Sequence, residues 1–226
     1  MPALDTDVMQ EHAANTWASP AHAEGYLARA DSIPHRDQGE AELLEWLPSR
    51  CARVLDLGSG DGRLLALVKR ARPGVEAVAL DFSEVMLSRL RARFSQDSGV
   101  TVVEHDLDSP LPPTLGRFDA VVSGFAIHHL SDDRKRALYE EVYGLLQPGG
   151  VFCNLEHVAS PTGEIHERFL ACLNLRPEEE DPSNRLVSVE TQLAWLRAIG
   201  FDHVDCHWKW RELALLAGAK SPAPVP

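Results

Sequence analysis

A run of glycines next to acidic residues is the part of this sequence best suited to holding a ligand. Gly58, Gly60 and Gly62 follow a short apolar segment at residues 53–57, and Asp56 lies within that segment. Glycine has no Cβ atom, so the backbone of such a turn can approach a bound molecule closely. Between a strand and a helix, this pattern is typical of a cofactor-binding turn.

The residue types around the turn favour a cationic group over a phosphate. Dinucleotide-binding turns have the pattern GxGxxG, in which the N-terminus of the following helix holds a pyrophosphate. Here Arg63 occupies the position of the third glycine, and the pattern is GxGxG. The carboxylates of Asp56 and Asp61 attract an ammonium and repel a phosphate. A nicotinamide dinucleotide is therefore disfavoured.

Acidic residues recur at the ends of the next two predicted strands. Asp81 ends the second strand, where a carboxylate can accept hydrogen bonds from both hydroxyls of a ribose, and Phe82 could pack on adenine. Asp106, or its neighbour Asp108, follows the third strand and could accept a hydrogen bond from the adenine amine. With Asp56, these carboxylates predict a nucleoside site at one edge of a parallel sheet.

The segments that position these residues alternate between short apolar runs and amphipathic stretches. This alternation is typical of βα units around a mostly parallel sheet. The predicted strands cover residues 53–57, 75–80, 100–104, 118–123 and 151–155, and the predicted helices cover residues 61–71, 83–94, 131–146 and 189–199. Two further strands at 203–208 and 212–216 are expected to form a closing hairpin.

The motifs, taken together and in order, resemble the class I S-adenosylmethionine-dependent methyltransferases. They are VLDLGSGDGRL, ALDFSEVML, EHDLDSPLP, FDAVVSGFAIHHL and LLQPGGVF, within about residues 50–155. The resemblance implies an α/β fold with a doubly wound, mostly parallel, seven-stranded Rossmann-like sheet whose C-terminal strand is antiparallel. It also implies that the glycine turn holds the methionine part of the cofactor and that Asp81 binds its ribose. It does not identify the methyl acceptor.

We therefore expect S-adenosylmethionine as the cofactor, held by residues of the turn, the strand ends and the N-terminal segment. The predicted cofactor-binding residues are Asp56, Gly58, Ser59, Gly60, Gly62, Asp81, Phe82, Met86, Asp106, Leu107, Ser123, Gly124, Phe125 and Arg36. Phe82, Met86 and Leu107 could equally be residues of the hydrophobic core. Arg36 could pair with the carboxylate of the cofactor.

Histidines are the main candidates for acid–base chemistry. His128 or His129 could act as a general base toward a hydroxyl, amine or carboxylic acid, although either could be a structural hydrogen-bonding group. The candidates for contact with the acceptor are Tyr26, His157, His166, Arg168 and Trp208. Residues 157–168 contain neither HxxxH nor HExxH spacing, so no metal site is expected.

Composition restricts the partners of the chain. The 226 residues, 44% of them hydrophobic, can bury one core, and the net charge of −12 disfavours DNA and RNA, whose binding relies on Lys and Arg. The four cysteines form no CxxC pair, the N-terminus lacks the pattern of a signal peptide, and no apolar run reaches the length of a membrane span. We expect a cytoplasmic protein that acts on a small molecule away from membranes; its oligomeric state stays open.

Two segments outside the alternation are expected to cover the site. Residues 1–50 are predicted to form a helical lid, and residues 157–188 a lid insertion within a core at 51–218. Residues 219–226 are predicted to be a disordered tail. The expected function is in-line methyl transfer to an oxygen, nitrogen, sulfur or carbon nucleophile. The alternatives are a non-catalytic S-adenosylmethionine sensor, a tRNA-modifying enzyme and an NAD-dependent oxidoreductase.

Overall fold

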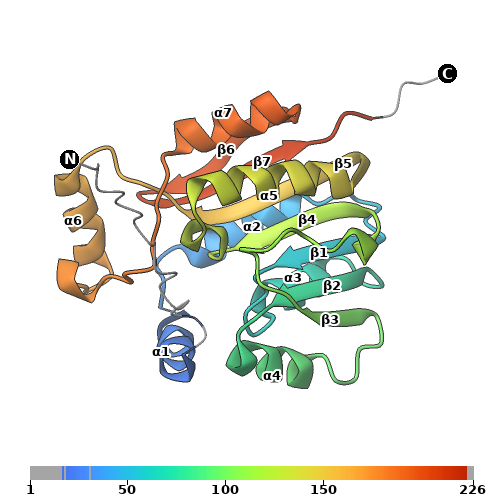
Figure 1. The fold of residues 1–226 in the computed structure, drawn as a ribbon, viewed down its shortest axis with the longest axis horizontal. Coiled ribbons are helices and arrows are strands. Elements are labelled where there is room, and N and C mark those ends of the chain that lie inside the picture. The colour runs from blue at the N-terminus through green and yellow to red at the C-terminus, as the bar shows by residue number, and fades with distance from the viewer. Residues whose placement is uncertain (1–16, 18, 31, 223–226) are drawn as a thin grey trace, which may run out of the picture.

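One mixed β-sheet forms the centre of the computed structural model, which describes residue 17, residues 19–30 and residues 32–222. Its strands are β1 (Arg53–Leu57), β2 (Glu76–Asp81), β3 (Val100–Glu104), β4 (Phe118–Gly124), β5 (Leu146–His157), β6 (Asp202–Trp210) and β7 (Leu213–Ala219). They form a seven-stranded sheet in the order β3-β2-β1-β4-β5-β7-β6 (Figure 1).

The strand directions confirm the predicted doubly wound sheet with its antiparallel end. β1 pairs in parallel with both β2 and β4, while β3 and β5 extend the parallel sheet on either side. β7 runs antiparallel to β5, and β6 runs antiparallel to β7, which confirms the predicted closing hairpin. Because the chain order reverses at β1 and β4, the carboxyl ends of these strands border a crevice in which ligands of such sheets bind.

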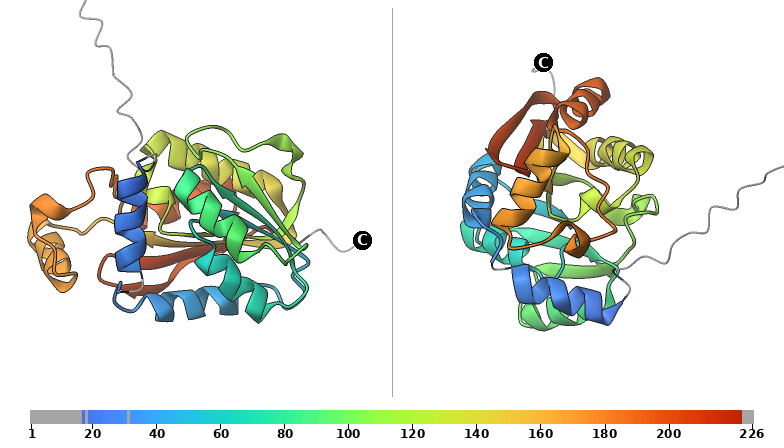
Figure 2. Two further views of the ribbon diagram at one scale, coloured as in Figure 1. Left: turned by 90° about the horizontal axis from the view of Figure 1, so that it is seen from below. Right: turned by 90° about the vertical axis from the view of Figure 1, so that its left-hand side faces the viewer.

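Helices cover both faces of the sheet (Figure 2). They are α1 (Pro20–Ala30), α2 (Arg36–Trp46), α3 (Arg63–Ala71), α4 (Glu84–Arg93), α5 (Asp132–Leu145), α6 (Gly163–Cys172) and α7 (Val189–Ile199). Buried residues of α5 and α7 pack against one face, and those of α2 and α3 pack against the other. None of the helices in the described ranges has both the length and the apolar character needed to cross a membrane.

Local sequence signals account for several helix boundaries. The side chain of Ser131 accepts a hydrogen bond from the backbone N–H of Arg134 at 3.3 Å, as expected for the N-cap of α5. Gly200 ends α7 in the left-handed conformation that favours glycine. The predicted starts and stops of these two helices are therefore confirmed.

The C-terminal boundary differs from the prediction. β7 extends to Ala219, and the backbone N–H of Lys220 bonds the carbonyl oxygen of Gly150 at 2.8 Å. The ammonium group of Lys220 also bonds the carbonyl oxygen of Tyr143 at 2.8 Å. Ala219 thus belongs to the sheet, and Lys220 is hydrogen-bonded to its edge, because the antiparallel contacts continue past the apolar part of β7. Residues 223–226 of the predicted tail, and residues 1–16, 18 and 31 of the predicted lid, lie outside the described residues.

Gly62 determines how closely α3 packs against α4. Its φ angle is +83°, and a Cβ atom at this position would lie 2.7 Å from Leu90 Cδ1 and 2.7 Å from Phe94 Cε2. Any larger residue would therefore strain the backbone and push the two helices apart.

Replacing Gly62 should consequently destabilise the fold. We expect Gly62→Ala to lower the free energy of unfolding by about 1–3 kcal/mol, measured by urea denaturation. Gly144→Ala is the matched control, because Gly144 lies within α5 and nothing lies within 4 Å of the added Cβ atom. The control should be unchanged or more stable by up to about 1 kcal/mol; equal losses in both variants would contradict the packing role of Gly62.

Candidate active site

A cavity of about 560 Å³ is bordered by the strand ends that carry the predicted cofactor-binding residues. Its volume falls in the range of about 300–1,000 Å³ usual for small-molecule sites. All of the predicted cofactor-binding residues except Gly62 and Ser123 line it: Asp56, Gly58, Ser59, Gly60, Asp81, Phe82, Met86, Asp106, Leu107, Gly124, Phe125 and Arg36. Contact of these residues with a cofactor stays a prediction.

The glycine turn brings the backbone close to the loop that follows β4. Gly58 and Gly60 have φ angles of +65° and +56°. A Cβ atom on Gly58 would lie only 2.3 Å from the Cβ atom of Ala126, so a side chain there would displace the loop. The turn and the residues after β4 therefore form one continuous wall of the cavity.

Asp81 holds this turn against the end of β2. Its Oδ2 atom accepts a hydrogen bond from the backbone N–H of Gly60 at 2.8 Å, and its Oδ1 atom accepts one from Ser83 at 2.9 Å. Burial raises the pKa of the Asp81 carboxyl, and these backbone hydrogen bonds oppose the rise. The carboxylate is thereby fixed in one orientation at the edge of the cavity.

Asp56 is a buried carboxyl group that lines the cavity. Its exposed fraction is 1%, and neither of its carboxyl oxygens has a hydrogen-bond partner among the described residues. Burial raises its pKa to about 7. Because an unpaired buried carboxyl group is costly, the site favours a ligand that brings a hydrogen-bond donor or a positive charge.

Arg36 is held at the cavity by residues of the N-terminal helices. Its Nε atom donates to Glu40 at 2.7 Å, and its guanidinium also donates to the hydroxyl of Tyr26 at 3.3 Å. The guanidinium carbon lies 5.2 Å from the ring centroid of Phe125. Glu40 additionally accepts a hydrogen bond from Arg63 at 2.9 Å, so the cation at the cavity wall is held in position by a buried carboxylate.

Two predicted cofactor-binding residues have structural positions instead. Ser123 is fully buried and donates a hydrogen bond from its hydroxyl to the carbonyl oxygen of Leu57 at 2.9 Å. This hydrogen bond connects the end of β4 to the end of β1. Gly62 supports helix packing, as described above. Neither residue is among those that line the cavity, and their contact with a cofactor stays a prediction.

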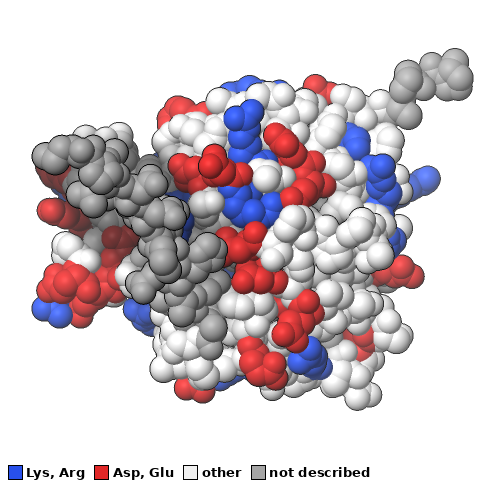
Figure 3. Space-filling model, viewed as in Figure 1, with Lys and Arg blue, Asp and Glu red and all other residues white. Residues whose placement is uncertain are grey.

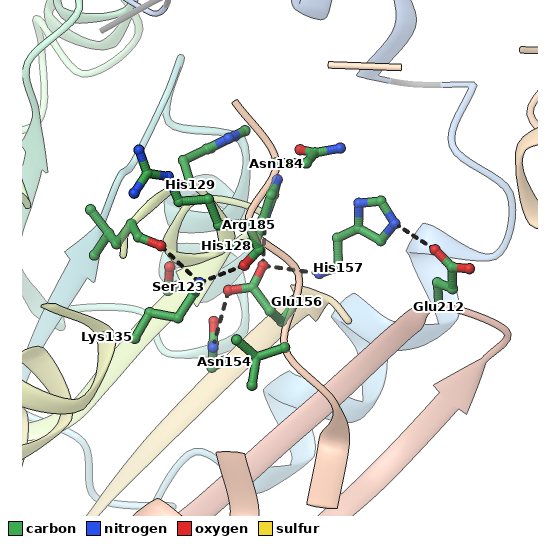
Figure 4. A network of polar contacts seen from close by, with 12 residues as sticks. Ser123, His128, His129, Lys135, Asn154, Glu156, His157, Asn184, Arg185 and Glu212 are labelled. Carbon is green, nitrogen blue, oxygen red and sulfur yellow. Dashed lines mark hydrogen bonds and ion pairs between the residues drawn. The ribbon is translucent and has the colours of Figure 1, made fainter. Parts of the chain in front are cut away.

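The candidate catalytic histidines separate into a buried residue and a cavity residue. His129 lines the cavity, whereas His128 is buried and its Nδ1 atom lies 2.6 Å from Glu156 Oε1. Figure 4 shows this pair within a network in which Asn154 also donates to Glu156, at 3.3 Å. Burial raises the pKa of Glu156 to about 7 and lowers that of His128 well below its usual value. His128 is thus positioned by Glu156 and is not among the residues that line the cavity, so a catalytic role for it stays a prediction.

Most of the predicted acceptor contacts also lie away from this cavity. Tyr26 lines it, but His157 and His166 bond Glu212, at 2.9 and 3.1 Å. Arg168 is exposed on α6, where it donates to Glu164. Trp208 packs beside α2: a Cβ atom on Gly39 would lie 2.9 Å from its ring. These four residues lie outside the lining of this cavity, and their contact with an acceptor stays a prediction.

Several lining residues were missed by the sequence reasoning. The end of the segment that follows α6 reaches the cavity through Pro182, Ser183 and Arg185, and α1 contributes Leu27 and Ala30. Within residues 157–188 the sequence had indicated His157, His166 and Arg168 instead, and a covering role for this segment stays a prediction. Among the described residues, no group of three or more His, Cys, Asp and Glu side chains is arranged to hold a metal ion.

Comparison with known proteins agrees with this architecture. Residues 54–150 match the family model described as a methyltransferase domain. The structure of an O-methyltransferase family protein from Burkholderia thailandensis superposes with a TM-score of 0.72 at 18% identity, covering 92% of this chain and 62% of that one. Over residues 54–150 this chain is therefore similar to methyltransferase domains. Human N-acetylserotonin methyltransferase, solved in complex with S-adenosylmethionine, has the same fold with a TM-score of 0.67 at 18% identity, covering 91% and 58% of the two chains.

Curated relatives of the methyltransferase domain differ in what their names say they act on. A demethylmenaquinone methyltransferase of Thermus thermophilus is 37% identical over 112 residues, which are 49% of this chain and 50% of that protein. A ribosomal RNA small subunit methyltransferase C of Shewanella loihica is 28% identical over 145 residues, which are 63% of this chain and 42% of that protein. The chain therefore spans about half the length of the curated relatives it matches.

The raised pKa of Asp56 predicts a pH-dependent contribution to stability. A carboxyl group whose pKa rises from 3.8 to about 7 on folding binds its proton more tightly in the folded chain. Folding stability therefore falls as the pH rises between these two values, by at most about 1.4 kcal/mol for each pH unit. Asp56→Asn cannot ionise and should lose this dependence. Its unfolding free energy minus that of the wild type, from urea denaturation without ligand, should increase over this pH interval.

The exposed carboxylate of Asp133 supplies the control for this measurement. The difference between Asp133→Asn and the wild type should not rise with pH over the same interval, since this group stays in water. A difference for Asp56→Asn that is equally flat would show that the Asp56 carboxyl is not destabilised by its burial.

Proposed function

We propose that this chain binds S-adenosylmethionine in the cavity and transfers its methyl group to a small molecule. The observation that carries the proposal is the buried, unpaired carboxyl group of Asp56 beside the glycine turn. An ammonium group would supply both the charge and the hydrogen bonds that this carboxyl lacks. Phosphate groups of a dinucleotide would instead add negative charge next to Asp56 and Asp81, which disfavours the NAD-dependent alternative.

The lining residues match the remaining parts of the cofactor. Arg36 would hold its carboxylate, and Asp81 would accept hydrogen bonds from its ribose hydroxyls. Phe82 and Met86 offer apolar surface for the adenine ring, and Asp106 offers an acceptor for its amine. When bound, the cofactor supplies a methyl group on a sulfonium, which leaves as a neutral thioether.

The cover of the cavity supports a small acceptor. Trp17, Tyr26 and Leu27 from the N-terminal segment meet Ser183 and Arg185 from the segment after α6 around the same cavity. Enclosure by these residues would hold the acceptor in line with the methyl group, and orientation of this kind supplies on the order of 7–11 kcal/mol in model reactions. Methyl transfer then does not require a catalytic side chain, although one could increase the rate further.

RNA is the second candidate acceptor, because an RNA methyltransferase is among the relatives. The charge of −12 opposes it, since RNA binding relies on basic residues. On the face shown in Figure 3, acidic side chains are interspersed with basic ones. A cytoplasmic location remains a prediction from the sequence.

Turnover separates these possibilities. Purified protein incubated with methyl-labelled S-adenosylmethionine should label a compound in a panel of small metabolites and leave bulk tRNA and ribosomal RNA unlabelled. Labelling of RNA alone would overturn the choice of a small acceptor. Binding of S-adenosylhomocysteine without any labelling would favour the non-catalytic sensor.

Asp81 provides the sharpest test of cofactor binding. Asp81→Asn removes a charged acceptor, worth about 1.5–3 kcal/mol per hydrogen bond, so the Kd for S-adenosylhomocysteine should rise about 10-fold to 100-fold in isothermal titration calorimetry. Glu104→Gln is the matched control: Glu104 pairs with Asp81 in the β2–β3 register but is exposed and lies outside the cavity lining. Unchanged affinity in Asp81→Asn would refute the ribose assignment. Binding of NAD by the wild type would refute the cofactor itself.

A further inference from the structure

His129 is the first member of a chain of hydrogen bonds that leads out of the cavity. Its Nδ1 atom lies 2.9 Å from the hydroxyl oxygen of Ser183, and that hydroxyl donates to Asp181 Oδ1 at 2.6 Å. The other carboxylate oxygen of Asp181 lies 2.9 Å from Nε2 of His22, on α1. The chain joins three segments that are distant in the sequence: α1, the 3-10 turn η3 (Ile127–His129) and the segment after the 3-10 turn η4 (Pro177–Glu179).

Backbone contacts fix Ser183 beside His129. The N–H of Arg185 donates to the carbonyl oxygen of His128 at 3.0 Å. The buried ammonium of Lys135 donates to the carbonyl oxygen of Leu130 at 2.8 Å and also to that of Arg185. Figure 4 shows Lys135 bridging these two segments. The position of Ser183 is therefore determined by the main chain on both sides of His129.

The direction of the hydrogen bonds determines the tautomer of His129. A serine hydroxyl has one proton, and that of Ser183 is given to the Asp181 carboxylate. The hydroxyl oxygen must then accept its second hydrogen bond, so Nδ1 of His129 carries the ring proton. The lone pair of the neutral ring is left on Nε2, for which the described residues provide no hydrogen-bond partner, and the ring lines the cavity.

The surroundings of His129 keep its imidazole ring neutral. Burial and the neighbouring His128 lower the pKa of His129, whereas the carboxylates of Asp181 and Glu156 oppose that effect. The ring of Trp17 packs on the remaining side, with the two centroids 5.0 Å apart. A neutral imidazole is the form that can accept a proton.

We propose that His129 is the general base of this site, with Ser183 and Asp181 as its positioning residues; the proposal rests on the proposed methyl transfer. The acceptor is then a molecule with an O–H or N–H group. Its oxygen or nitrogen forms a bond to the methyl carbon as the carbon–sulfur bond breaks and leaves its electron pair on sulfur. The proton of the acceptor moves to Nε2 of His129, and Ser183 connects the resulting imidazolium to the Asp181 carboxylate.

The tautomer can be measured without knowing the acceptor. In protein labelled with ¹⁵N-histidine, NMR should show His129, assigned by comparison with His129→Gln, protonated at Nδ1 and unprotonated at Nε2 near neutral pH. Ser183→Ala should lose this preference and show signals of both tautomers. Ser95→Ala, at an exposed serine outside the cavity lining, should leave the spectrum of His129 unchanged. A wild-type ring protonated at Nε2, or an unchanged tautomer in Ser183→Ala, would overturn the proposal.

Isothermal titration calorimetry on the same samples distinguishes failure of this proposal from failure of the proposed function. S-adenosylhomocysteine should bind the wild type and Ser183→Ala with Kd values within about threefold, because Ser183 acts on the acceptor's proton and not on the cofactor. Absence of binding to the wild type would refute the proposed function while leaving the tautomer result intact. With an acceptor that turns over, His129→Gln should lower kcat by about 10²-fold to 10⁴-fold with little change in KM. An equal kcat in His129→Gln would also overturn the role of His129.

Discussion

The hydrogen bond from the backbone of Gly60 to the carboxylate of Asp81 connects the two halves of the candidate cofactor site. It fixes the glycine turn after β1 against the end of β2, so that the turn, Asp56 and Asp81 face one cavity. The bond is possible because the turn has left-handed backbone angles, which glycine adopts without strain. Carboxylates at adjacent strand ends would otherwise repel each other, and this backbone donor stabilises one of them.

Much of the fold could be predicted because its signals are local. Alternating apolar segments identified the strands, and Ser131 and Gly200 identified helix ends through capping interactions that involve only neighbouring residues. The acidic residues Asp56 and Asp81 could be predicted as well, since the order of the strands brings their carboxyl ends to the same edge. The length of β7 could not be predicted, because Lys220, which follows it, is held by Tyr143, 77 residues earlier in the chain.

The positions of the polar residues that we considered for contact with the acceptor depend on tertiary contacts, which cannot be identified from the sequence. His128 and His129 are adjacent and chemically identical, yet one bonds buried Glu156 and the other faces the cavity. His157 was a reasonable candidate until Glu212, 55 residues further along the chain, proved to be its partner. Ser183 had no recognisable motif, and its importance follows only from the proximity of η3. Residue type limits what a side chain can do, whereas tertiary packing decides which interaction it makes.

The contact between His22 and Asp181 joins the two segments that cover the cavity, and both residues lie outside the 54–150 region shared with the family. Most of the cavity lining comes from residues 54–150, whereas Tyr26, Arg36, Ser183 and Arg185 come from the chain on either side of that region. A substitution in these flanking segments would therefore reshape one side of the cavity while the hydrogen bond between Gly60 and Asp81 stays in place.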